Sequence, residues 1–292
     1  MNRQHWRAVC VVVAVALLVG ACAGGKGGGL NLQNIDIGQL TQNLRGLREV
    51  SEPEEIEIGS GVTETLLGAR PLDTDDELQR YVNVVGLWVA RQSERPDLPW
   101  HFAVNDSDHV NAFAAPGGNI IITRGMMRLL RNESELAGVI GHEVVQVVNK
   151  HHLSAIRKNA FMDLLGQGVS AAAQGTRSQG LVNALIGPTK ELYARGLDKS
   201  DEFEADRMGV VIAARAGYDP WGLPATLQTL AGIKPGDSNL ALLFKTHPAP
   251  AARLEKLAVA MGTSFDQMAG GGASTERFAR IAQRIRLADA RR

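Results

Sequence analysis

Apolar residues recur every three or four positions along much of the chain, which is the spacing of helices with one buried face. A helix in the first half is expected to begin after a cap at Thr74 or Asp75, and a later one to break near Asn132 and restart at Ser134. The predicted helices cover 52–67, 75–92, 126–156, 199–217 and the end of the chain from about Ser274.

In two other stretches apolar and polar residues alternate, as they do in β-strands. Residues 100–105 ("WHFAVN") form one, and 111–125 form two strands around a Pro-Gly-Gly turn at 116–118. We therefore predict one α+β domain, mainly helical, with a small sheet. The segment 166–187, rich in Ala, Gly, Ser and Gln, shows neither pattern, so no structure is predicted for it.

The N-terminus carries the features of an export signal. Arg3 and Arg7 are basic, and the apolar run 8–20 is too short to cross a bilayer. The run leads into "VGAC", small residues before Cys22 that resemble a bacterial lipobox. We expect cleavage before Cys22 and a diacylglycerol group on its thiol. The alternative is an ordinary signal peptide with an incidental cysteine.

The residue after Cys22 is Ala23, not the aspartate that in many lipoproteins means retention in the inner membrane. We therefore expect an outer-membrane lipoprotein that faces the periplasm and contacts the membrane through its anchor. Residues 1–21 would be the signal peptide, 22–50 a glycine-rich tether and N-terminal segment, and 51–292 the folded domain.

Composition adds three bounds to this picture. A chain of 292 residues with 45% hydrophobic residues can bury a proper core. The formal net charge of zero and the pI near 7.1 give no reason to expect a nucleic-acid partner. Cys10 would leave with the signal and Cys22 would be lipidated, so no disulfide is expected.

Candidate chemistry begins at "GHEVVQVVNKH", residues 141–151. Two side chains four residues apart on a helix can share a metal ion, and zinc peptidases place two histidines at this spacing with a glutamate beside the first. His142 and Glu143 supply the first half of that motif, but Gln146 stands where the second histidine belongs. A lone His-Glu pair is common by chance and is weak support by itself.

The later stretch "DEFEAD" strengthens the prediction of a metal site. Glu202 and Asp206 lie four residues apart on a predicted helix and face the same way. A carboxylate from a second helix can complete a metal site, and an acid one turn on can hold the other nitrogen of a liganding histidine. The alternative is a solvated acidic helix face made of Glu202, Glu204 and Asp206.

Four segments occur together and in order: "NAFAAPGGNIIITRGM", "ELAGVIGHEVVQVVNKH", "EFEADRMG" with "RAGYDP", and "THPAPAARL". They resemble the BepA-type periplasmic zinc metallopeptidases, gluzincins related to HtpX and the CAAX prenyl proteases, and the likeness covers roughly Glu52 to Leu257. The resemblance implies a zincin-type metallopeptidase domain whose small sheet lies beside the active-site helix, with one Zn²⁺ per chain.

The resemblance also implies roles for single residues. His142 would be the first zinc ligand and Glu202 the carboxylate ligand. Glu143 would be the general base, and Asp206 would hold the far nitrogen of His142. His247 and Arg253 match the family's His-Pro…Arg segment, which lies over the active site, so we count both as catalytic candidates.

Gln146 departs from the family pattern because it takes the place of the second histidine ligand. A neutral amide is a poor donor to zinc, so metal affinity should fall. In BepA-like relatives the histidine that matches His247 can approach the zinc. His247 could therefore be a substitute ligand, with Gln146 offering a weak amide oxygen or holding a water.

The other histidines are not expected to bind metal. On a continuous helix His151 would lie about 180° from His142 and His152 about 80°, so neither would face the site. His101 and His109 flank the predicted strands and are expected to be ordinary surface residues.

The "NAFAA" stretch is the candidate for substrate binding. An extended chain could add to the edge of the sheet through backbone hydrogen bonds, a mode that reads extension more than sequence. The alternative is an internal strand with no role in binding. The candidate residues are Asn111, Ala112, Phe113 and Ala114.

Three functions remain open at this stage. The first is a zinc endopeptidase of the bacterial envelope that hydrolyses misfolded or unassembled proteins. The second is a pseudo-protease that binds such clients as a chaperone or assembly factor, which Gln146 favours. The third is a structural or adaptor lipoprotein with a vestigial site. A site free of selection tends to lose several residues, so the first is favoured by the intact Glu143, Glu202, Asp206, His247 and Arg253.

The C-terminal helix has one apolar and one basic side. A helix that packs on the core with a solvated basic face is the favoured interpretation, and a membrane-surface or partner-binding helix is the alternative. The apolar side consists of Phe278, Ile281 and Ile285, and the basic side of Arg277, Arg280 and Arg284.

Overall fold

The computed structural model describes residues 50–158, 193, 195–234, 236–268 and 275–291. The expected signal peptide, the lipidation site at Cys22, most of the tether and the segment 166–187 lie outside the described residues, so the predictions for them stay predictions. Among the helices that are described, none combines the length and the apolar character needed to cross a membrane.

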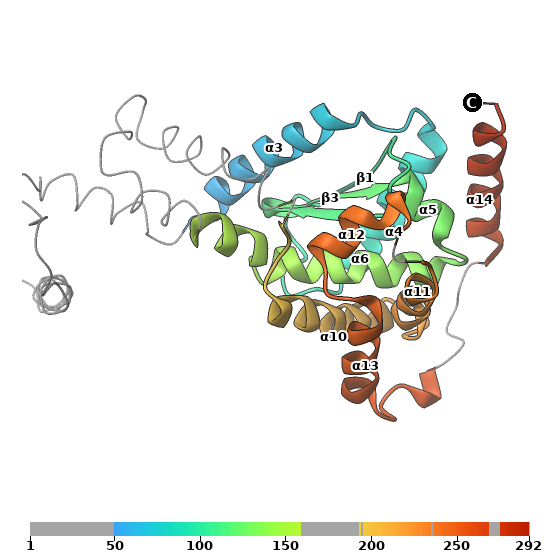
Figure 1. Cartoon of the computed structure of the whole chain (residues 1–292). Coiled ribbons are helices and arrows are strands. Elements are labelled where there is room, and N and C mark those ends of the chain that lie inside the picture. The colour runs from blue at the N-terminus through green and yellow to red at the C-terminus, as the bar shows by residue number, and fades with distance from the viewer. Residues whose placement is uncertain (1–49, 159–192, 194, 235, 269–274, 292) are drawn as a thin grey trace, which may run out of the picture. The chain divides into compact units, whose positions relative to one another are not determined.

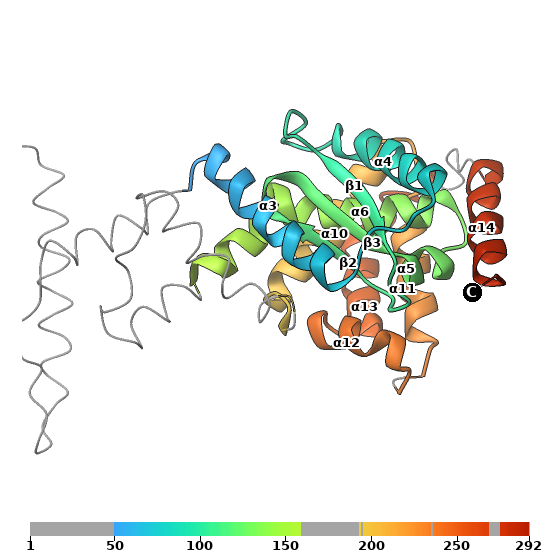
Figure 2. The same cartoon turned by 90° about the horizontal axis from the view of Figure 1, so that it is seen from above.

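The three predicted strands are present and form one mixed sheet in the order β1-β3-β2 (Figures 1 and 2). β1 (His101–Asn105) runs parallel to β3 (Asn119–Thr123), and β2 (Ala112–Ala115) runs antiparallel to it. β2 and β3 are joined by the short 3-10 turn η2 (Pro116–Gly118), where the φ of 76° at Gly117 suits glycine. Within the described sheet, β2 is therefore an edge strand.

Helices cover both faces of the sheet (Figure 1). α3 (Glu52–Ala69) begins at the N-cap Ser51 and lies over one face, and α6 (Glu133–Val148) lies under the other. α4 (Asp76–Ala90) packs along β1. Its N-cap is Asp75, whose carboxylate accepts from two backbone N–H groups of the first turn.

The remaining helices follow the sheet in sequence, and several of them pack on α6. α11 packs across α6, and both α10 and α11 contact α13. The helices α11, α12 and α13 had not been predicted. The elements are α5 (Arg124–Leu129), α10 (Lys199–Arg215), α11 (Gly222–Ala231), η3 (Ser238–Leu240), α12 (Ala241–Thr246), α13 (Pro250–Met261), η4 (Asp266–Met268) and α14 (Thr275–Asp289).

The prediction of one helix from 134 to 156 was wrong. α6 ends at Val148, Lys150 has a left-handed backbone with φ 56°, and a new helical segment covers 151–158. The angles expected for His151 and His152 on a continuous helix therefore do not apply. His151 contacts Glu204 at 3.2 Å, away from the predicted metal ligands.

α6 and α10 cross so closely that their backbones touch. A Cβ atom on Gly141 would lie 2.5 Å from the carbonyl oxygen of Gly209, and one on Gly209 would lie 2.6 Å from the backbone nitrogen of His142. Glycine at both positions is what permits the approach. The crossing brings His142 beside the helix that carries Glu202 and Asp206.

α14 packs on the core beside α5, as the favoured interpretation of its apolar side predicted (Figure 1). Phe278, Ile281 and Ile285 are each at most 3% exposed. Two of its arginines hold it to the domain, since Arg277 binds Glu133 and Arg284 binds Asp75.

Candidate metal centre

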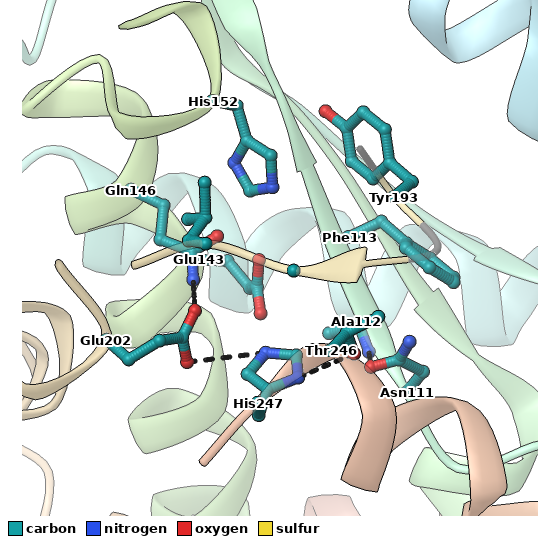
Figure 3. A pocket seen from close by; sticks show the side chains of 12 residues that line it. Asn111, Ala112, Phe113, Glu143, Gln146, His152, Tyr193, Glu202, Thr246 and His247 are labelled. Atoms are coloured by element: carbon teal, nitrogen blue, oxygen red, sulfur yellow. Dashed lines mark hydrogen bonds and ion pairs between the residues drawn. The ribbon is translucent and has the colours of Figure 1, made fainter. Parts of the chain in front are cut away.

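Three side chains from three separate elements converge beside the edge strand β2, and Figure 3 shows two of them, Glu202 and His247. His142 comes from α6, Glu202 from α10, and His247 follows directly after α12. Their ligand atoms all lie within 4.8 Å of one another. The Nε2 atoms of both histidines lie 3.7 Å from Oε2 of Glu202. The sequence-predicted set is thus brought together.

The chemistry and spacing of these side chains fit a metal ion. Oε2 of Glu202 is buried and accepts no hydrogen bond from the described part of the chain, an arrangement that is unfavourable unless something else satisfies it. Tetrahedral zinc spaces neighbouring ligand atoms about 3.3 Å apart, close to the 3.7 Å separations found here. Two imidazoles and one carboxylate are also donors that zinc accepts.

Gln146 reaches into the same space from one turn further along α6 (Figure 3). Its amide nitrogen lies 2.9 Å from Nε2 of His142 and donates to Oε1 of Glu202 at 3.2 Å. Nδ1, the other nitrogen of His142, lies 3.0 Å from Oδ1 of Asp206 and 3.2 Å from Nη2 of Arg253. With the proton on Nδ1, shared with Asp206, Nε2 accepts from the Gln146 amide. The amide nitrogen therefore joins two predicted ligands. The expectation from the sequence, that Gln146 offers an amide oxygen to a metal or holds a water, stays a prediction.

An acid–arginine pair lies behind His142. Nδ1 of His142 is 3.0 Å from Oδ1 of Asp206, and Nε of Arg253 donates to Oδ2 of Asp206 at 2.9 Å. Burial opposes the charge on Asp206, but Arg253 outweighs it and holds the pKa of Asp206 well below its usual range. Arg253 was expected over the active site, and its contacts with Asp206 instead favour a role in positioning.

Glu143 follows His142 on α6 and faces the cavity in front of the predicted ligands (Figure 3). Its side chain is 3% exposed, and burial raises its pKa to about 7. A carboxyl group with a pKa near neutrality can both accept and return a proton, which is what a general base in hydrolysis has to do.

The edge of β2 borders the same cavity. Thr123 N–H donates to the carbonyl of Asn111 at 3.0 Å, and alternate residues of a strand face the same neighbour, so the backbone groups of Ala112 and Ala114 face the outer edge. The Ala112 N–H donates to Oδ1 of Asn111 at 3.0 Å. The Ala114 carbonyl accepts from the Tyr193 hydroxyl at 2.5 Å. In this state the chain's own groups satisfy part of the edge.

Tyr193 and His152 form a wall of the cavity that the sequence did not indicate. Their rings stack with centroids 4.8 Å apart and planes 7° apart (Figure 3). His152 lies outside the group of candidate ligand atoms in the described residues, but it lines the cavity. Burial lowers its pKa to about 3, so the ring is neutral at physiological pH. Both positions are set by the fold and carry no motif of their own.

Gly196 closes the cavity against the segment that carries His247. Its φ is 84°, and a Cβ atom there would lie 1.8 Å from the carbonyl oxygen of Thr246. Thr246 precedes His247, and its hydroxyl lies 2.9 Å from Nδ1 of that ring. The backbone around Gly196 and the segment 246–247 thus meet directly.

Comparisons with known proteins agree with this geometry. A sequence profile of peptidase family M48 matches residues 76–260. The chain is 30% identical over 207 residues to a protein of Escherichia coli O157:H7 named "Beta-barrel assembly-enhancing protease", covering 69% of this chain and 42% of the relative. It is 31% identical over 172 residues to "Mitochondrial metalloendopeptidase OMA1" of Arabidopsis thaliana, covering 59% and 33%.

A protein of Yersinia pestis with the β-barrel name is 30% identical over 212 residues, which cover 70% of this chain and 43% of the relative. The chain thus spans less than half the length of these three relatives. The matches confirm the resemblance predicted from the four motifs, and with it the mainly helical α+β fold.

Proposed function

The chain belongs to peptidase family M48, and we propose that it is a zinc-dependent endopeptidase of the bacterial cell envelope. Its substrates would be misfolded or unassembled proteins bound as extended strands. The observation that carries the proposal is the unpartnered Oε2 of Glu202, 3.7 Å from Nε2 of both His142 and His247. A cation among these three atoms would satisfy all of them.

The envelope location is supported by the expected signal peptide 1–21 and lipidation site Cys22. It is also supported by the similarity to proteins named for enhancing β-barrel assembly. We therefore place the folded domain, 51–292, on a 22–50 tether at the outer membrane, facing the periplasm. Its substrates or clients would be unfolded or unassembled envelope proteins.

His142, Glu202 and His247 would hold one Zn²⁺ per chain. When bound, the ion supplies a Lewis acid that polarises the peptide carbonyl and makes water a better nucleophile. Glu143 takes the proton from the attacking water and returns it to the leaving nitrogen. Asp206, held by Arg253, keeps the ring of His142 in place.

The substrate would lie along the outer edge of β2, beside Glu143. For that, the Tyr193 hydroxyl has to leave the Ala114 carbonyl and the Asn111 side chain has to leave the Ala112 N–H. A histidine that serves as a ligand cannot also move aside to admit a substrate. We therefore expect slow turnover while His247 takes the place that the family gives to a second α6 histidine.

A specific observation favours a second candidate, a pseudo-protease that binds clients as a chaperone or assembly factor. The Gln146 amide joins His142 and Glu202 by hydrogen bonds without any ion. To offer its oxygen to a metal, the amide would have to rotate and give up both contacts. A client could still add to the β2 edge in such a protein.

Metal content decides between the two. The full chain is stripped with chelator, given zinc, and weighed by native mass spectrometry beside His247→Ala and Glu202→Gln. About one zinc per chain, lost in both variants, supports the peptidase, and casein cleavage lost in Glu143→Gln completes the case. No retained zinc at micromolar concentration rejects it and leaves the client-binding candidate.

A further inference from the structure

In the described part of the chain, large apolar side chains are exposed next to one another at one place, the outer side of α4. Val84 is 59% and Trp88 50% exposed, and they lie one helical turn apart with the half-buried Leu87 beside them. Single exposed apolar residues are normal, whereas neighbours on one face of a helix mark a contact surface. The other exposed large apolar residues lie on four different segments and are Leu72, Val259, Met268 and Leu287.

Two arginines flank these apolar side chains. Arg80 precedes Val84 by one turn and Arg91 follows Leu87 by one turn, so all of them fall on one side of the helix. Both arginines are exposed, and neither forms an ion pair with any described residue. We call this surface the α4 face. It consists of Arg80, Val84, Leu87, Trp88 and Arg91, and positions 80–91 contain no acidic residue.

The glutamates nearest to the two ends of the α4 face are already paired. Glu77 is bound to Arg284 at 2.8 Å, and Glu94 is bound to Arg215 at 3.2 Å. Asp76 is exposed and lies one turn before the face begins. The two arginine charges of the face therefore remain available to an anionic partner.

Trp88 is half exposed, yet its ring is held in place. The indole N–H donates to the carbonyl of Ala216, at the end of α10, at 2.8 Å. A fixed ring has little conformational entropy left to lose when it docks. Tryptophan and aliphatic side chains between two arginines suit a membrane–water interface, because the ring lies at the depth of the headgroups while the arginines reach the phosphates.

The size of the α4 face favours a bilayer over a protein partner. The face has five side chains, whereas a specific protein interface takes about 20–30 residues from each side. The proposed anchor would also hold a bilayer nearby, since the residues between Cys22 and Val50 can span at most about 100 Å. Docking on the same membrane is then an intramolecular event, for which a weak contact suffices.

We propose that the α4 face docks on the surface of an anionic lipid bilayer. Arg80 and Arg91 bind lipid phosphates, and Val84 and Trp88 enter the boundary between headgroups and acyl chains. The inference rests on the membrane anchor of the proposed function and does not depend on zinc or on cleavage.

Docking through α4 has a consequence for the candidate site. α4 packs along β1, which is the strand at the opposite edge of the sheet from β2 (Figure 2). A domain that lies on the membrane through the α4 face therefore keeps the β2 edge directed away from the bilayer, where envelope proteins can reach it.

Trp88 itself reports the contact. The mature lipidated chain is reconstituted into vesicles of phosphatidylcholine, with or without phosphatidylglycerol, whose acyl chains carry bromine as a short-range quencher. Trp88→Phe gives the emission of the remaining tryptophans, which is subtracted. Val84→Glu disrupts the face, and Val259→Glu is the matched control, because both valines are exposed on helices but only Val84 belongs to the face.

We expect brominated vesicles that contain phosphatidylglycerol to quench Trp88 in the wild type and in Val259→Glu, and to leave it unquenched in Val84→Glu. Emission of Trp88 that bromine does not quench in the wild type, or quenching that Val84→Glu retains, overturns the inference. Self-association that Val84→Glu abolishes while Trp88 stays unquenched also overturns it, because the face would then bind a second copy.

The arginines provide a second arm. The double variant Arg80→Gln and Arg91→Gln should lower the ratio of docked to free domains about thirtyfold, at roughly fivefold for each arginine near an anionic surface. The same pair of changes at Arg280 and Arg286, both exposed on α14, should leave the quenching unchanged. An equal loss in the two double variants overturns the assignment to α4.

Failure of the proposed function is recorded separately. The intact mass of the chain tests the lipid on Cys22, and zinc content tests the peptidase. Quenching of Trp88 in a chain that retains no zinc supports the α4 face while the peptidase proposal fails, and absent quenching in a zinc-loaded chain overturns the α4 face while the peptidase stands.

Discussion

Two buried glutamates on neighbouring helices differ in how far the protein satisfies their carboxylates with hydrogen bonds. Glu133, at the start of α6, is fully buried, and its carboxylate accepts from the hydroxyls of Tyr81 at 2.7 Å and Tyr218 at 3.0 Å and from Nε of Arg277 at 2.8 Å. Glu202, on α10, is 1% exposed, and within the described part of the chain its carboxylate accepts one hydrogen bond, from Gln146. Its second oxygen accepts none from the described residues.

The pKa values of the two glutamates are shifted in opposite directions. Burial tends to raise the pKa of Glu133, but Arg277 and the two tyrosine hydroxyls outweigh it and hold the pKa below its ordinary value. For Glu202 burial prevails over the nearby cations and raises the pKa. A carboxylate that the protein satisfies completely stabilises the fold, whereas one left short of partners is prepared for a ligand.

The largest expected effect is on the metal-free stability of the matched pair Glu133→Gln and Glu202→Gln. The first should lower the free energy of unfolding by about 3 kcal/mol, because it breaks a buried ion pair and leaves buried hydroxyls short of an acceptor. The second should change it by less than about 1 kcal/mol. Urea unfolding in chelator measures both, and equal losses would contradict the comparison.

Zinc should narrow the difference in stability between the two variants. At a concentration of 100 times its dissociation constant, a ligand of the native state adds about 2.7 kcal/mol to the free energy of unfolding. The wild type and Glu133→Gln should both gain this increment in thermal unfolding. Glu202→Gln should gain none, and a gain there would show that the metal binds elsewhere.

Lowering the pH should destabilise the wild type more than it destabilises Glu133→Gln. The folded pKa of Glu133 lies below its ordinary value of 4.5, so its contribution is fully present above that value and is lost as the pH falls through the folded pKa. Between pH 5 and strong acid, metal-free wild type should therefore lose more stability than Glu133→Gln. Parallel slopes in urea unfolding at several pH values would mean that the shift is absent.

The smallest effect is expected at a tyrosine hydroxyl. Tyr193→Phe removes the hydrogen bond to the Ala114 carbonyl, worth about 1 kcal/mol, and should tighten binding of an extended peptide to the β2 edge roughly fivefold. Tyr218→Phe is the control, because its hydroxyl serves Glu133. It should lower stability and leave peptide affinity unchanged, as titration with a labelled peptide would show.

Local signals account for the parts of the fold that could be predicted. The Asp75 cap, the restart of a helix after Asn132 and the turn at 116–118 each depend on the residues present at that point. The break at Lys150 was missed because it has neither glycine nor proline to mark it.

Some features of the candidate site could likewise be predicted from the sequence, and others could not. Spacing and motif order brought His142, Glu202 and Asp206 together in advance. The orientation of the Gln146 amide could not be predicted, because it depends on a carboxylate from another helix and on the tautomer that Asp206 imposes on His142. The close crossing of α6 and α10 could have been predicted from Gly141 and Gly209, because both glycines lie inside predicted helices.

Gly196 has a consequence for how this protein can change over generations. The backbone contact with Thr246 exists because position 196 carries no side chain, and its φ of 84° disfavours any other residue. Any side chain there would meet the Thr246 carbonyl, and the two segments would have to move apart to make room. Position 196 can therefore change only together with the placement of the segment that carries His247.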